Sequence, residues 1–229
     1  MVIHVVAEQA TLEGRSDKPG YLHGMGSLIN AELLRDLAAQ ARVTPLVAGD
    51  AAPEPRYRPS AALADFVRAR DLTCRAPGCN RPAVVCDLDH TVPYSEGGAT
   101  HASNIKCLCR FHHIIKTFWG WRDCQLPDGT VIWDLPDGQT YITLPGSALL
   151  FPALMTPTGA LPVKPQPPDP ESSAEREAMM PPRSRTRAQN RSQRIAAERN
   201  HNRQLRQAAE AQLPTPPPPR WHPDDGPPF

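Results

Sequence analysis

Two sets of side chains that bind metals are interleaved between residues 74 and 113. The first set is Cys74, Cys79, Cys109 and His112, which form two closely spaced pairs. Thiolates and imidazoles are the ligands that Zn²⁺ prefers, and four of them in two pairs are typical of a closed structural site. We therefore expect a zinc ion that joins a turn at the first pair to the start of a helix at the second.

The second set contains Asp89, His90, Asn104 and His113. Hydrolysis of a phosphodiester needs a base for water and a cation that neutralises the phosphoryl oxygens and stabilises the leaving oxygen. An imidazole with a pKa of about 6.5 suits the first task, so His90 is the expected base. Asp89 and His113 are expected to hold one divalent ion, Mg²⁺ or Mn²⁺, with open positions for water and phosphate. Asn104 is expected to hold the loop and to orient His90.

Neighbouring residues leave alternatives open for both sets. Cys107 lies close to Cys109 and is an alternative ligand, whereas Cys86 and Cys124 fit ordinary core or structural positions. Asp87 shares a strand face with Asp89, so it is expected behind the ligands, with direct coordination as the alternative. Since adjacent strand residues point to opposite faces, Asp89 and His90 must lie at a strand end if both face the site.

Basic residues near both sets could hold phosphate groups of a nucleic acid. For each of them the alternative is a solvated surface charge. The expected phosphate-binding residues are Arg75, Arg81, Lys106, Arg110 and Lys116, with Arg122 as a further candidate.

Local patterns predict the elements that must position these residues. Ser60 begins a helix that runs to about Asp71, with Leu63 and Phe66 on its buried face. A weak strand in residues 1–12 and a helix after Asn30 are expected upstream. Downstream we expect strands at 84–90 and 104–108, a helix at 110–118 and a meander at 119–126, 130–135 and 140–144.

Composition limits the size of the folded part. The chain has 229 residues and 28 prolines, of which seventeen follow Leu150, and a small core usually needs a staple. The net charge is +1, with arginines concentrated between residues 183 and 206. The start lacks the basic and apolar segments of a signal peptide, and no apolar run approaches the roughly 20 residues of a membrane span. We therefore expect a cytoplasmic protein without a membrane segment, in which six cysteines serve metal binding rather than disulfides.

These residues resemble the HNH endonuclease family, in its zinc-bearing ββα-metal branch. The resemblance runs through Leu88-Asp89-His90, Gly97-Gly98, Asn104 to Leu108 and Cys109-x-x-His112-His113, and ends at Lys116. The letters of the family name fall on His90, Asn104 and His113. The resemblance implies a metal-dependent nuclease that acts on double-stranded DNA and leaves a 5′-phosphate and a 3′-hydroxyl.

More loosely, the whole chain resembles the C-terminal part of an actinobacterial repeat-element family. In that family a helical domain of unknown function precedes the HNH module and an Arg/Pro-rich tail. We therefore expect an α+β chain with four parts. These are a helical remnant at 1–48, a linker at 49–59, a zinc-stapled nuclease domain with a β-meander at 60–150 and a disordered tail at 151–229.

Two other functions fit the residues. One is a catalytically inactive, zinc-stabilised module that binds nucleic acid or protein, and the other is an unrelated zinc protein. The full set of Asp89, His90, Asn104 and His113 favours cleavage, because a module that only binds has no need of a free base beside a carboxylate. The residues by themselves do not choose DNA over RNA.

Overall fold

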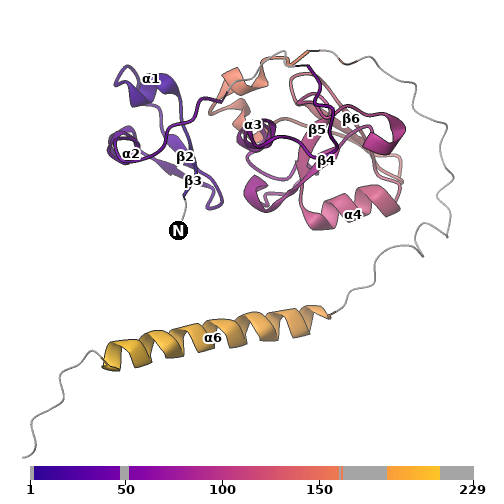
Figure 1. The fold of residues 1–229 in the computed structure, drawn as a ribbon. Coiled ribbons are helices and arrows are strands. Elements are labelled where there is room, and N and C mark those ends of the chain that lie inside the picture. Colours follow the sequence, from indigo (N-terminus) through magenta and orange to yellow (C-terminus); the bar gives the residue numbers. More distant parts are fainter. Residues whose placement is uncertain (1–2, 47–51, 160, 162–184, 212–229) are drawn as a thin grey trace, which may run out of the picture. The chain divides into compact units, whose positions relative to one another are not determined.

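The computed structural model describes residues 3–46, 52–159, 161 and 185–211 (Figure 1). The chain divides into two units, Met1–Met180 and Pro181–Phe229. In the second unit, α6 (Arg187–Ala211) is a helix of 25 residues within the region expected to be disordered. The rest of the expected tail beyond residue 161 lies outside the described residues. No described helix is both long and apolar enough to cross a bilayer.

The N-terminal segment contains a small antiparallel sheet, which corrects the expectation of a helical remnant; its first strand lies within residues 1–12, where a weak strand was expected. Asn30 caps the second helix by accepting a hydrogen bond from the backbone of Leu33, as its residue type predicted. The second and third strands have three residues each, which is too short to show a period of two, so the sequence pattern did not reveal them. The elements are β1 (Val5–Val6), α1 (Gln9–Leu12), β2 (Gly20–Leu22), β3 (Ser27–Ile29) and α2 (Ala31–Ala38), with strand order β1-β2-β3.

A strand-strand-helix arrangement carries most of the candidate site residues, whereas Cys74 and Cys79 lie in the turn at residues 74–79, before the first strand. β4 (Asp87–His90) pairs antiparallel with β5 (Ile105–Leu108), and α4 (Arg110–Phe118) follows and contacts both strands (Figure 1). The expected helix and second strand are confirmed. The first strand is shorter than the expected 84–90, because Ala83–Val85 form a 3-10 turn, η1.

The core of this region lies between a helix and two sheets. α3 (Ala61–Asp71) begins after Ser60, whose side chain accepts a hydrogen bond from the backbone of Leu63, as expected. Phe66 and Val67 of this helix are buried against Ile105 and Trp133. The expected meander is confirmed as β6 (Arg122–Gln125), β7 (Val131–Asp134) and β8 (Thr140–Thr143).

The folded unit extends past residue 150, where the domain was expected to end. Phe151 is buried, and the Ser103 hydroxyl lies 2.9 Å from Thr158 Oγ1 and 2.7 Å from Gly159 O. The 3-10 turns η3 (Gly146–Ala148) and η4 (Pro152–Met155) contact α3. Such single turns carry no hydrophobic period that a sequence pattern could reveal.

A buried carboxylate joins α3 to β5. Asp71 accepts hydrogen bonds from Arg70 Nε and from the backbone nitrogen of Cys107, both at 2.8 Å. Arg75 Nε lies 3.8 Å from the same carboxylate. Arg70, Asp71 and Arg75 are all buried, so this ion cluster is removed from the screening of water.

We predict that Asp71→Ala lowers the free energy of unfolding by about 3–5 kcal/mol, because it leaves two guanidinium groups buried without a carboxylate. Chemical denaturation with zinc present measures this change. The matched control is Asp17→Ala, which removes an exposed carboxylate 3.6 Å from Arg35 and should change stability little. Equal midpoints for the two variants would contradict the structural role of Asp71.

Candidate metal centres and active site

The four expected zinc ligands converge in one buried group. The ligand atoms of Cys74, Cys79, Cys109 and His112 all lie within 4.8 Å of one another. His112 Nδ1 is 3.3 Å from Cys109 Sγ and 3.6 Å from Cys74 Sγ. Sulfur atoms about 2.3 Å from a tetrahedral zinc lie about 3.8 Å apart, so this spread fits one ion. The arrangement is a Cys₃His group consistent with a structural zinc site.

The backbone around the ligands explains why they meet. Gly78 has a φ of 67°, which lets the chain turn back so that Cys79 N donates to Ala76 O. Cys109 is the N-cap residue of α4, and its backbone nitrogen donates to Cys74 Sγ at 3.2 Å. His112 then follows within the first turn of the helix, so both pairs face the same point.

The thiols need a cation to become thiolates at neutral pH. A hydrogen bond with Cys86 and burial raise the pKa of Cys74, and burial raises the pKa of Cys79 to about 11. A bound Zn²⁺ reverses this effect, because a coordinating thiol is deprotonated. The alternative ligand Cys107 does not belong to the group: it is fully buried in β5, outside the four-ligand cluster.

We predict about one tightly held zinc ion per chain and loss of the folded unit when a ligand is replaced. In Cys79→Ser, zinc content by mass spectrometry should fall and cooperative thermal unfolding should disappear, because zinc binding and folding are coupled. Cys124→Ser is the control, since Cys124 is an exposed free cysteine outside the group. A Cys79→Ser protein that keeps both zinc and its melting transition would remove Cys79 from the ligand set.

The second candidate centre lies where β4 meets α4. His113 Nε2 is 3.4 Å from Asp89 Oδ1, and His113 Nδ1 is 2.8 Å from Asp87 Oδ2. A carboxylate oxygen accepts hydrogen bonds, so the Asp87 contact places a proton on Nδ1 of His113. His113 Nε2 then faces a carboxylate oxygen of Asp89, so these two atoms are positioned to share a cation.

The spacing of these two atoms fits a six-coordinate divalent ion. Two neighbouring ligands of Mg²⁺, each at about 2.1 Å, lie about 3.0 Å apart, close to the 3.4 Å between His113 Nε2 and Asp89 Oδ1. Asp87 lies behind His113 rather than in the ligand pair, as expected from its strand position. A carboxylate in this place fixes the orientation of a ligand imidazole.

Two lysines hold the other oxygen of Asp89. Lys106 Nζ and Lys116 Nζ lie 2.8 Å and 2.7 Å from Asp89 Oδ2, and both are also paired with Asp123, at 2.5 Å and 3.0 Å. Burial alone would raise the pKa of Asp89, but Lys106 and Lys116 outweigh it and lower the pKa to about 2. Asp89 is therefore ionised at neutral pH, and only Oδ1 is turned toward His113.

These positions correct part of the expected phosphate-binding set. Lys106 is fully buried in the ion cluster, and Arg75 is buried with its guanidinium bonded to the backbone oxygens of Gly129, Thr143 and Leu144. Neither cation is accessible to a phosphate in this fold. Three expected residues keep some exposure: Arg81 and Arg110 are exposed, and the Lys116 side chain is 12% exposed.

His90 lies on the other face of β4 from Asp89, in an aromatic environment. Its ring stacks on Tyr57 at 5.5 Å and contacts the edge of Tyr94 at 5.9 Å. Burial lowers the pKa of His90 despite the opposing effect of Asp89, so the ring is neutral at pH 7. Strand alternation thus places His90 on the opposite face from Asp89, although the two residues are adjacent at the end of β4.

The contacts of His90 select one tautomer. Its Nε2 is 3.0 Å from Thr100 Oγ1, and that hydroxyl donates to Tyr57 O at 3.4 Å. Because a hydroxyl has only one proton to donate, His90 Nε2 must be the donor toward Thr100. Nδ1 then carries the lone pair that could accept a proton.

Asn104 holds the loop between β4 and β5. Its side chain accepts from Val92 N at 2.9 Å and donates to Val92 O at 3.1 Å and Ala99 O at 2.9 Å. Gly98, within this loop, packs closely against Val92 because it lacks a side chain: a Cβ there would lie 1.8 Å from Val92 O. The loop that carries Thr100 is therefore closely fixed against the end of β4.

Three residues of the site had no signal in the sequence pattern. Asp123 lies in the meander, and its charge gave no hint of a pairing with two distant lysines. Tyr57 lies in the expected linker, and Thr100 lies in the expected loop. A sequence pattern records local spacing, whereas these residues act through contacts over 7 to 33 positions along the chain.

We predict that Asp123→Ala lowers the free energy of unfolding by about 3–5 kcal/mol, because two buried ammonium groups then share one carboxylate. The double variant Asp123→Ala/Lys106→Met removes one charge of each sign and should recover part of the loss. A denaturation double-mutant cycle measures the coupling. Additive effects of the two substitutions would show that Asp123 and Lys106 do not act as a pair.

Comparison with known proteins places the chain among uncharacterized relatives. Residues 1–71 match the family model "Domain of unknown function (DUF222)". The chain is 46% identical over 227 residues to the uncharacterized protein Rv3776 of Mycobacterium tuberculosis, covering 88% of this chain and 43% of the relative. It is 52% identical over 185 residues to Rv2100 of the same species, covering 77% of this chain and 32% of the relative. No solved structure matches. The chain therefore has a DUF222 match at its N-terminus and spans less than half the length of these homologous mycobacterial proteins.

Proposed function

We propose that this chain is a metal-dependent endonuclease of the HNH type that hydrolyses phosphodiester bonds in DNA. The observation that carries the proposal is the approach of Asp89 Oδ1 and His113 Nε2 to 3.4 Å. His90, the candidate base, follows Asp89 directly in β4 but lies on the opposite face of the strand. The homologues are uncharacterized, so the support comes from the site and from the resemblance of its residues to the HNH family.

Each residue has a defined role in the proposed reaction. His90 Nδ1 takes a proton from the attacking water, while Thr100 holds the opposite ring nitrogen. Asp89 and His113 would hold Mg²⁺ or Mn²⁺, and such an ion would stabilise charge on the phosphoryl and leaving oxygens. Asn104 keeps the loop beside His90 in place. The Cys₃His group would hold a structural zinc ion, and Arg81 and Arg110 offer exposed charges for DNA phosphates.

One observation favours a second function, a zinc-stabilised module that binds nucleic acid without cutting it. Lys106 and Lys116 already neutralise the second oxygen of Asp89, so the carboxylate offers less charge to a divalent ion than an unpaired one would.

We predict that the purified chain nicks plasmid DNA with Mg²⁺ or Mn²⁺ and that His90→Ala lowers the rate by about 10²–10⁴-fold, the usual contribution of a general base. Gel analysis of supercoiled plasmid measures the nicking rate. His201→Ala, which removes an exposed histidine of α6, is the control and should retain activity. Because burial lowers the pKa of His90, activity should decline only as the pH falls below the ordinary histidine range.

Equal nicking by the wild type and His90→Ala would point to a contaminating nuclease and would remove His90 from its role. If the wild type binds DNA but does not cut it with either ion, the binding-only function replaces the nuclease.

A further inference from the structure

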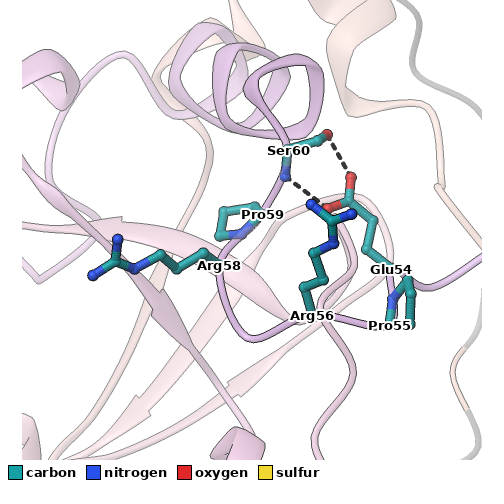
Figure 2. A pocket seen from close by; sticks show the side chains of 6 residues that line it. All are labelled: Glu54, Pro55, Arg56, Arg58, Pro59 and Ser60. Atoms are coloured by element: carbon teal, nitrogen blue, oxygen red, sulfur yellow. Dashed lines mark hydrogen bonds between the residues drawn. The ribbon is translucent and has the colours of Figure 1, made fainter.

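The segment of residues 54–60, which we call the strap, lies across the loop between β4 and β5. Glu54 N donates to Thr100 O at 2.9 Å, and Tyr94 Oη donates to Pro55 O at 3.3 Å. At the other end, Ser60 donates to the Glu54 carboxylate through its backbone nitrogen, at 2.7 Å, and through its hydroxyl, at 2.5 Å (Figure 2). The strap is therefore held along its length rather than being the free linker expected from its prolines.

Tyr57 connects the strap to the candidate base. Its ring is stacked on His90 with an angle of 15° between the planes, yet 59% of Tyr57 remains exposed. A nucleotide can stack on the exposed part of such an aromatic ring, here next to the candidate general base His90. The strap therefore places the exposed Tyr57 ring directly against the His90 ring, whose Nδ1 is the candidate proton acceptor.

Two arginines flank this tyrosine. Arg56 and Arg58 are exposed, and neither has a hydrogen-bond or ion-pair partner among the residues that the structure describes. They line an open depression of about 600 Å³ together with Glu54, Pro55, Pro59 and Ser60 (Figure 2). The Glu54 carboxylate accepts both hydrogen bonds from Ser60, so it serves the start of α3.

We propose that the strap binds the DNA strand at the cleavage site, with Arg56 and Arg58 on its phosphate groups and Tyr57 on a base or sugar. A guanidinium can bond a phosphate through two parallel hydrogen bonds. Arg56 and Arg58 need not first give up a hydrogen bond or ion pair with another described residue to do so. An exposed arginine alone would be a solvated charge. Here the backbone between the two arginines is fixed and the intervening ring covers the candidate base. The location at a cleavage site rests on the proposed function, whereas the binding of DNA does not.

The test measures DNA binding without cleavage. The probe is a fluorescent duplex of about 20 base pairs, titrated in EDTA against the zinc-loaded full chain carrying His90→Ala. In that background Arg56→Gln/Arg58→Gln should weaken binding about tenfold and lower the slope of log affinity against log salt by about two, one for each lost phosphate contact. The matched control is Arg15→Gln/Arg42→Gln, which removes two exposed arginines outside the strap. Arg56→Lys/Arg58→Lys should retain most of the salt slope.

The outcomes separate the strap from the nuclease. Unchanged affinity and salt slope in the Arg56→Gln/Arg58→Gln protein, or the same loss in the control, would overturn the strap proposal even if the wild type cuts plasmid. If Arg56→Gln/Arg58→Gln selectively weakens DNA binding but the wild type never cuts plasmid, the strap proposal is supported and the nuclease proposal fails. Zinc content and melting temperature verify the fold, and both arginine side chains are exposed, so neither should change.

Discussion

The meeting of the residue 74–79 turn with the first turn of α4 is the constraint on which the site depends. Cys109 and His112 can face Cys74 and Cys79 only if α4 begins at that point and runs alongside β4. Successive helix residues differ in direction by about 100°, so His113 then faces the strand while its neighbour faces the thiols. The candidate divalent-ion pair is thus a geometric consequence of the Cys₃His group.

Buried charges connect the segment from Cys74 to Phe118, which we call the finger, to the rest of the unit. One cluster uses Asp71 at the end of α3, and the other uses Asp123 in β6. A charge removed from water destabilises the fold unless it is paired. Separating the partners of either cluster would leave a buried charge unpaired, so each cluster holds together the elements that carry its residues. The finger therefore draws its support from segments on both sides of its own sequence motif.

Local chemistry made part of this structure predictable. Ser60 and Asn30 as caps, the bounds of α4, the three strands of the meander and the four ligands all follow from residue types at short spacing. Lys106 and Arg75 could not be placed in the same way, because a basic residue in sequence is indistinguishable from a surface charge until its distant acid is known. The strands β2 and β3 and the turns after Leu144 lack a repeated pattern, so only tertiary contacts define them.

α3 belongs to two regions at once. The DUF222 match ends at residue 71, the last residue of this helix, whereas Phe66 and Val67 are part of the hydrophobic core around β5 and β7. A boundary drawn from sequence similarity at that residue would cut through a continuous interior. A recombinant fragment that starts after it would carry the cysteine ligands but expose the apolar side of β5, so expression of the finger should begin upstream of Ser60.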